Sequence, residues 1–219
     1  MNMDSLKTIT DLIPQQRKED RLNVYLDGAY AFGLHISIAA DLRVGQQLAP
    51  EECEELQSRD AVYRAYERAL RFLSYRPRSR AEVERHLQNK GLSETAAGQV
   101  VARLEGKGWL SDSSFAEFWV DNREAFRPRS RWAMSQELRQ KGVSDQVIER
   151  ALQDVDEAAS AYRAAEGRAQ RLARLDYQTF RRRLGGFLQR RGFRYDVIKD
   201  VVERLWQECA GNREGARSS

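Results

Sequence analysis

The sequence predicts a mainly α-helical protein of three tandem three-helix repeats, preceded by a small β-hairpin or meander. Apolar residues recur at spacings of three and four from about residue 50 onward, which is typical of amphipathic helices. A block of similar sequence occurs three times, and the first fifty residues alternate with a period of two instead. One such unit buries little surface alone, so we expect the repeats to form a bent, elongated rod.

Residues 1–50 are expected to form the small N-terminal β-rich segment. Apolar and polar residues alternate over Leu22–Leu34, interrupted by Asp27-Gly28, a dipeptide typical of two-residue hairpin turns. A further strand is expected over Ile9–Ile13, ended by Pro14, because proline cannot donate to a strand ladder. The segment therefore predicts a hairpin with a third strand beside it.

The repeated block joins the end of one helix, a glycine turn and the start of the next helix. Its glycines lie where we expect a left-handed backbone, and a further amphipathic helix precedes each block. Pro50 and the acidic residues after it predict the start of the first of these helices. The copies are Leu87–Ser93, Leu138–Ser144 and Leu188–Phe193. The expected domains are 51–110 (first repeat with its lead-in helix), 111–155, 156–210 and a disordered tail, 211–219.

Two loops share the sequence Arg-Pro-Arg-Ser-Arg, at residues 76–80 and 127–131. Proline breaks a helix, and Ser79 with Glu82 forms a capping box, so part of the motif is helix punctuation. The arginines are not explained in this way, because cations at a helix N-terminus are mildly destabilising. Arginine beside N-terminal amides is suited to bind phosphate or carboxylate, whereas a solvated loop is the structural alternative.

The third unit carries a similar concentration of arginine near the equivalent place and at the end of the same helix. We therefore predict that these loops face an anionic partner, either protein or DNA. The candidate binding residues are Arg76, Arg78, Arg80, Arg127, Arg129, Arg131, Arg181, Arg182, Arg183, Arg190 and Arg191.

The charge is distributed unevenly along the chain. Residues 1–59 hold 6 basic and 10 acidic side chains, whereas the remainder holds 31 basic and 23 acidic ones. Of the 37 basic residues, 31 are arginine, the side chain suited to bidentate contacts with phosphate and carboxylate. This favours an anionic partner for the helical part, although a single arginine on a helix face is as often solvated.

The sequence gives little support to catalysis. His35 and His86 do not fall in any recognised nucleophile pattern, and no phosphate-binding glycine loop, dinucleotide fingerprint or zinc-ligand spacing occurs. Asp196 and Asp200 share a helix face, but we interpret them as solvated ion-pairing residues rather than a metal site. We expect a binding protein that is not an enzyme and uses no cofactor or metal.

Two widely separated cysteines, with no signal segment and no membrane-spanning run, favour a reducing cytoplasm. The absence of a heptad seam favours a monomer.

Residues 60–208 resemble the RecX family of recombination regulators. The likeness is carried by residues 76–82, 108–123, 137–143 and 187–193, which include Gly108-Trp109-Leu110-Ser111-Asp112 and Gln140-Lys141-Gly142. Residues 9–56 are similar to an N-terminal extension found in some members. The pieces are specific as a set, although each alone is a weak signal.

The resemblance implies a cytoplasmic protein that binds the RecA recombinase, especially its filament on DNA. It implies modulation, mostly inhibition, of recombinase ATP hydrolysis and strand exchange, in homologous recombination, DNA repair and the SOS response. It also implies weak binding of single- and double-stranded DNA without sequence preference. The alternative is a helix-turn-helix-like transcriptional regulator, since three-helix units with basic loops also resemble that class; a small nuclease ranks third.

Overall fold

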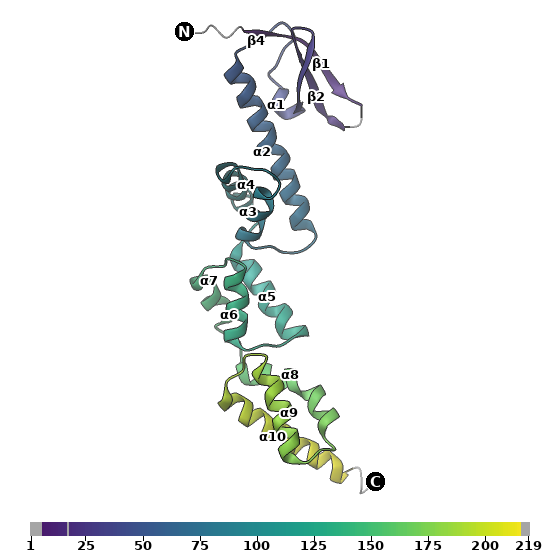
Figure 1. Ribbon diagram of the computed structural model, residues 1–219, viewed down its shortest axis with the longest axis vertical. Helices are drawn as coiled ribbons and strands as arrows, with labels where there is room; N and C mark the ends of the chain where they lie inside the picture. The colour runs from purple at the N-terminus through teal and green to yellow at the C-terminus, as the bar shows by residue number, and fades with distance from the viewer. Residues whose placement is uncertain (1–5, 17, 216–219) are drawn as a thin grey trace. The chain divides into compact units, whose positions relative to one another are not determined.

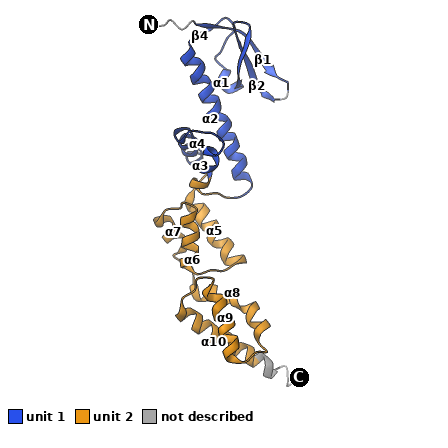
Figure 2. Ribbon diagram, in the orientation of Figure 1, with its two compact units in different colours: residues 1–76, 83–109 blue, residues 77–82, 110–219 orange. Residues whose placement is uncertain are grey.

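The computed structural model describes residues 6–16 and 18–215 of the chain (Figure 1). The chain divides into two compact units, one of residues 1–76 and 83–109 and the other of residues 77–82 and 110–219 (Figure 2). The boundary therefore cuts through the first Arg-Pro-Arg-Ser-Arg loop and assigns residues 77–82 to the second unit.

The first unit begins with an antiparallel sheet of strand order β3-β2-β1-β4. Its strands are β1 (Lys7–Gln15), β2 (Lys18–Leu26), β3 (Ala29–His35) and the short β4 (Gln47–Leu48). Asp27 and Gly28 both have positive φ, 49° and 82°, as the turn between β2 and β3 requires, which confirms the predicted hairpin. Buried residues of the sheet pack on Cys53 and Leu56 of the following helix.

Strand β1 continues past Pro14, where the sequence predicted its end. Pro14 lies opposite Leu22, and the register shifts between Pro14 and Gln15. Proline is tolerated there because β4 pairs only with Lys7 and Thr8, so that among the described strands none pairs with β1 on that side at Pro14.

The first repeat consists of α2 (Pro50–Ser74), α3 (Arg80–Gln88) and α4 (Glu94–Gly106). Helix α2 begins at Pro50 as predicted, and Glu52 accepts a hydrogen bond from the Ala49 amide at 2.7 Å. This one helix serves two cores, because Cys53 and Leu56 belong to the sheet core, whereas Ala65 and Ala69 are buried further along it. A four-residue helix, α1 (Ile36–Ala39), lies between β3 and β4.

The second unit contains the other two repeats. The second repeat is α5 (Asp112–Phe126), α6 (Arg131–Gln140) and α7 (Asp145–Leu152), and the third is α8 (Glu157–Leu172), α9 (Tyr177–Gln189) and α10 (Tyr195–Gly215). Each has a core of its own, centred on Phe115 and Leu138 in one and on Phe180 and Leu188 in the other. The three predicted three-helix repeats are thus confirmed; their arrangement as a rod stays a prediction.

The glycine turns adopt the predicted left-handed backbone, with φ of 89° at Gly91, 79° at Gly142 and 88° at Gly192. Helix α10 extends through Gly215, so helix covers the start of the segment expected as a tail, and residues 216–219 lie outside the described part.

A candidate partner-binding surface at the repeat junctions

The first Arg-Pro-Arg-Ser-Arg loop is fixed by the glycine turn of the second repeat. Ser79 is fully buried; its hydroxyl accepts from the Glu82 amide at 3.2 Å and donates to the Lys141 carbonyl at 2.5 Å. The Lys141 ammonium pairs with Glu82 at 2.9 Å. The predicted capping box is confirmed, and its serine also joins the loop to the next repeat. We call this contact of loop 77–82 with Lys141-Gly142 the first junction.

The second loop makes an equivalent contact with the third repeat. Ser130, also fully buried, caps α6 through the Ala133 amide at 3.1 Å, and its own amide donates to the Arg191 carbonyl at 3.2 Å. The Arg191 guanidinium donates to the Pro128 carbonyl at 2.8 Å. The repeat register thus places corresponding residues together twice. We call this contact of residues 128–133 with Arg191-Gly192 the second junction.

The N-termini of α3 and α6, where the sequence suggested a bound anion, are occupied by other parts of the chain. At α3 the first amide, that of Arg80, donates to the Asp112 carboxylate at 2.8 Å, so the chain supplies its own carboxylate. At α6 the following turn of the third repeat lies against Ser130. The backbone amides therefore hold the repeats together, and any anion-binding role falls to the arginine side chains.

Glu137 gathers polar side chains beside the second loop. Its carboxylate accepts from the Trp119 indole at 2.7 Å and pairs with Arg123 at 2.7 Å and Arg129 at 3.0 Å. Arg123 and Lys141 also lie over the Trp119 ring, at 4.6 and 5.4 Å from its centroid. The Glu137 carboxylate thus pairs with two arginines, so these side chains together keep a net positive charge.

Three predicted arginines come together at the second junction, and we call Arg127, Arg129 and Arg191 the basic junction. Burial lowers the pKa of Arg191, and the nearby charges of Arg129 and Arg127 lower it further. Arg191 also stacks on Phe187 at 4.6 Å, with Arg168 at 4.9 Å from the same ring. Because like charges repel here, a bound anion would stabilise this site.

The other predicted arginines are not part of the basic junction. Arg76 and Arg78 are half-buried, whereas Arg80 and Arg131 are exposed at the starts of α3 and α6. The remaining four lie exposed on or just beyond α9: Arg181, Arg182, Arg183 and Arg190. Sequence reasoning missed Arg123, Lys141 and Arg168, whose part depends on the rings and carboxylates that they contact.

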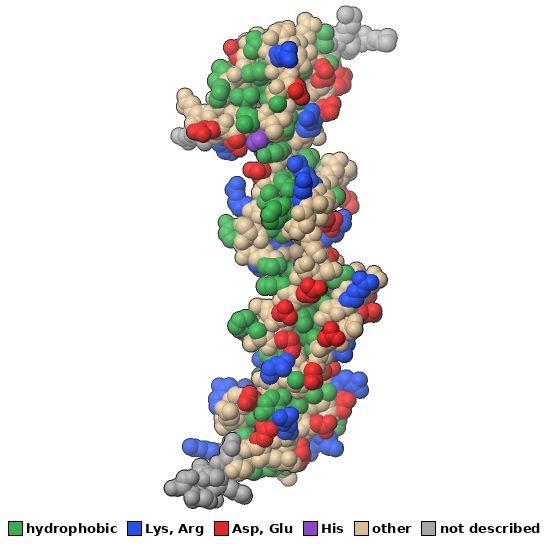
Figure 3. Space-filling view, turned by 180° about the vertical axis from the view of Figure 1, so that it is seen from behind, with side chains coloured by type: hydrophobic (Ala, Val, Ile, Leu, Met, Phe, Trp, Pro, Cys, Tyr) green, Lys and Arg blue, Asp and Glu red, His purple; other side chains and the backbone are tan. Residues whose placement is uncertain are grey.

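Charged side chains of both signs are interspersed over the visible face in Figure 3, without one large basic patch. Exposed aromatic residues accompany the loops: Tyr75 and Phe126, which directly precede the two motifs, are each 77% exposed, and Trp132 is 65% exposed. Phe118, which lies three residues after the buried Phe115, is 40% exposed. Local clusters of arginine with aromatic rings are therefore the surfaces suited to a partner.

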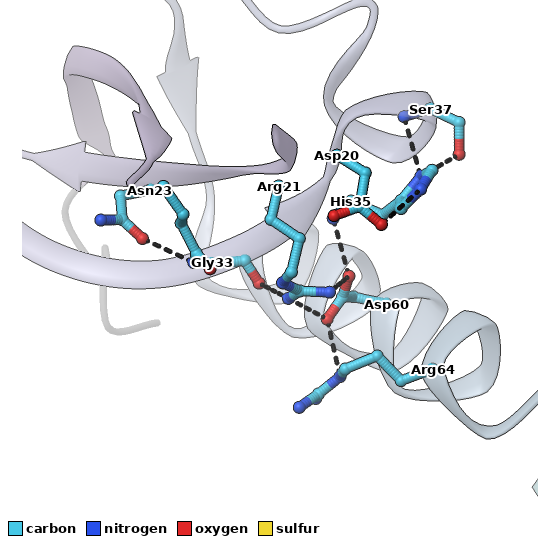
Figure 4. A network of polar contacts seen from close by, with 9 residues as sticks. Asp20, Arg21, Asn23, Gly33, His35, Ser37, Asp60 and Arg64 are labelled. Atoms are coloured by element: carbon cyan, nitrogen blue, oxygen red, sulfur yellow. Dashed lines mark hydrogen bonds and ion pairs between the residues drawn. The ribbon is translucent and has the colours of Figure 1, made fainter. Parts of the chain in front are cut away.

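A separate polar network fixes the sheet to α2 in the first unit (Figure 4). Asp60 is 1% exposed and accepts from Arg21 at 2.8 and 3.1 Å, from Arg64 at 2.9 Å and from the His35 amide at 2.8 Å. Arg21 also donates to the Gly33 carbonyl at 2.8 Å. These bonds satisfy a buried carboxylate and are structural; no local sequence signal indicated them.

Within residues 6–16 and 18–215, no group of three or more metal-ligating side chains comes together. In the same part of the chain, no helix is long and apolar enough to cross a membrane. The fold and the junctions together define a class: a tandem three-helix-repeat protein with an arginine cluster where the second and third repeats meet.

Comparison with known families agrees with this class and makes it specific. The model of the regulatory protein RecX N-terminal domain matches residues 7–49, and the models of the first, second and third RecX three-helix domains match residues 65–104, 111–152 and 154–202. The chain belongs to the RecX family.

Individual relatives support the assignment over most of the chain. Regulatory protein RecX of Bacillus subtilis is 32% identical over 91% of this chain and 78% of the relative, and that of Bacillus licheniformis is 31% identical over 95% and 80%. A crystal structure of regulatory protein RecX superposes with a TM-score of 0.72 and 26% identity, covering 89% of this chain and all of the other. RecX from Lactobacillus salivarius gives 0.60 at 26% identity, over 67% and 97%.

Proposed function

We propose that this protein binds the RecA recombinase on its DNA filament and modulates, mostly by inhibiting, its ATP hydrolysis and strand exchange. The observation that carries the proposal is the basic junction, where the Arg191 guanidinium is held on the Pro128 carbonyl at 2.8 Å, close enough to Arg127 and Arg129 for their charges to lower its pKa. Carboxylates of the recombinase, or phosphates of the DNA inside its filament, would neutralise this repulsion. Membership of a family of regulatory proteins adds support.

Several repeats would allow several moderate contacts along one filament. Each weak contact becomes effective because the first one holds the others close to their targets. Contacts to DNA would be made to phosphates, so they would be weak, sensitive to salt and without sequence preference. We further propose that the protein acts in the cytoplasm as a monomer, without cofactor and without catalysis of its own.

The test is single-stranded-DNA-dependent ATP hydrolysis by RecA, with strand exchange measured in parallel, as the protein is added from substoichiometric to stoichiometric ratios. Inhibition at substoichiometric ratios would support binding to the filament, because one molecule then affects many protomers. No effect at any ratio would refute the proposal.

The alternative, a helix-turn-helix-like transcriptional regulator, would read DNA with the third helix of a repeat. In the second repeat that helix is α7, which exposes the acidic side chains of Asp145 and Glu149. Carboxylates on this face would oppose the approach of phosphates. A footprint at one promoter would nevertheless favour the regulator over the recombinase partner.

A further inference from the structure

The third repeat contains an open groove of about 490 Å³ between α9 and the start of α10. Gly185 and Gly186 line it from α9, Tyr177 and Tyr195 line it from the first residues of α9 and α10, and Arg181 and Arg182 add two positive charges. None of the lining residues that the structure describes is acidic. None of its lining residues belongs to either junction, although Gln189 and Phe193 flank the Arg191-Gly192 turn of the second junction.

The second repeat fills the equivalent place with its own side chains. The residues 50 positions earlier than Gly185, Gln189 and Tyr195 are Ser135, Arg139 and Asp145. There, Arg139 pairs with Asp145 at 2.7 Å and donates to the Ser135 hydroxyl at 3.4 Å. The third repeat has no such ion pair, because Gln189 and Tyr195 stand in place of Arg139 and Asp145. Glycine also stands in place of Ser135, so the groove is open and its lining contains no carboxylate.

Packing does not require either glycine. A Cβ at Gly185 would meet the Ile198 side chain at 3.6 Å, and one at Gly186 would meet the Arg190 guanidinium at 3.6 Å, both ordinary van der Waals distances. Glycine is nevertheless among the least favourable residues inside a helix. Two successive glycines therefore weaken α9. They also leave its half-buried backbone without side chains of their own at this place, which is useful where a ligand approaches closely.

The walls of the groove offer aromatic surface and donors of hydrogen bonds. Tyr195 is 70% exposed, and its hydroxyl accepts from the Arg181 guanidinium at 3.3 Å. Tyr177 is held by a 2.8 Å hydrogen bond from its hydroxyl to Glu203 and by ring contact with Trp206. The exposed Tyr195 ring is thus available for stacking, whereas the Tyr177 ring is fixed. Arg181 and Arg182 are both exposed.

We infer that this groove binds one base of a single-stranded nucleic acid. The base would lie on the Gly185-Gly186 backbone against the Tyr195 ring, with an adjacent phosphate on Arg181 and Arg182. A planar ring fits a floor without side chains, stacking on tyrosine tolerates any base, and paired arginines suit phosphate. A duplex would not fit, because its bases are stacked within the helix. This inference concerns a different site from the basic junction and does not depend on the recombinase.

The test measures fluorescence anisotropy of a labelled oligothymidylate with the full-length protein, beside the same strand with abasic sites. We expect the normal strand to bind at least roughly fivefold more tightly, the effect of one stacked base. Gly186→Gln, which restores the residue of the second repeat, should remove this difference, as should Tyr195→Ala. Gly167→Gln is the matched control, because Gly167 lies in α8 with nothing within 4 Å of its Cβ position.

Because glutamine is a better helix former than glycine, Gly186→Gln should unfold at the same or a higher temperature than the wild type. Loss of binding in this variant would therefore not reflect misfolding. Equal affinity of the wild type for normal and abasic strands would overturn the inference, as would unchanged discrimination in Gly186→Gln. Displacement of the labelled strand from Arg181 and Arg182 by a glutamate-rich peptide, without any base-dependent binding, would also overturn it and favour an acidic protein segment.

Discussion

The Lys90-Gly91 turn of the first repeat and the Lys141-Gly142 turn of the second have the same sequence and backbone but different neighbours. A Cβ at Gly91 would meet nothing within 4 Å, whereas one at Gly142 would clash with the Cβ of Ala81. The local sequence thus specifies the turn, and the position in the array decides whether it also joins two repeats. In the third repeat, Gly192 likewise lies against Ser130 and Ala133.

The largest effect is expected from alanine at these turns. Both glycines have positive φ, so Gly91→Ala should cost about 1–2 kcal/mol in backbone strain. Gly142→Ala adds a steric clash and should cost about 3–4 kcal/mol in total. Denaturant unfolding of both variants measures the difference, and equal losses would show that the first junction contributes nothing.

The next effect concerns the position occupied by His86, Glu137 and Phe187 in the three repeats. Phe72 and His86 stack at 4.0 Å, whereas Glu137 pairs with Arg123 and Arg129. Glu137→Gln would leave these cations without their carboxylate and should lower the free energy of unfolding by about 2 kcal/mol. Glu149→Gln, on the exposed face of α7, should stay within about 0.5 kcal/mol; a similar loss in both would refute the role of Glu137.

Serine caps give a smaller contrast. Ser93 caps α4 at an exposed position, whereas Ser79 caps α3 and also donates to Lys141. Ser93→Ala should cost about 1 kcal/mol, and Ser79→Ala about 2 kcal/mol because the Lys141 carbonyl also loses its donor. Chemical unfolding curves of the two variants would contradict this account if Ser93→Ala were the more damaging.

The smallest effect is a dependence on pH. When the second and third repeats are aligned, α9 begins one turn earlier than α6. It is capped by Asp176 instead of serine, and the hydrogen bond from the Thr179 amide lowers the pKa of this carboxyl. A lowered pKa in the folded state stabilises the protein above the ordinary pKa, and this contribution is lost as the pH falls below about 4. Asp176→Ser keeps a cap that does not titrate, so its thermal unfolding should depend less on acid than that of the wild type. Identical pH profiles would contradict this.

Much of the fold could be predicted from local patterns. Asp27-Gly28 predicted the hairpin, and the recurring glycine block predicted three repeats, because both features act over a few residues. Spacing alone would misplace Phe118, which lies three residues from Phe115, a spacing that suits a core. At about 100° per residue, however, the buried stripe of Phe115, Ala116 and Val120 leaves Phe118 roughly 60° outside it.

The candidate site was predictable in composition but not in arrangement. Repetition of the motif singled out Arg127 and Arg129, and the third block contained Arg191. Their meeting depends on how one repeat docks on the next, which brings together Pro128 and Arg191, 63 residues apart. The Asp60 network was not predictable for the same reason, since Arg21 and Asp60 belong to different elements.

The central claim, that the basic junction binds an anionic surface of the recombinase filament, is tested most directly by the affinity of Arg127→Glu for RecA filaments assembled on single-stranded DNA. Arg127 is exposed, and its reversal would relieve repulsion with Arg129 and Arg191, so the variant should fold at least as stably as the wild type. The account predicts binding weakened by roughly tenfold, against less than about twofold for Arg150→Glu on the exposed face of α7. Unchanged affinity of the folded Arg127→Glu variant would contradict it.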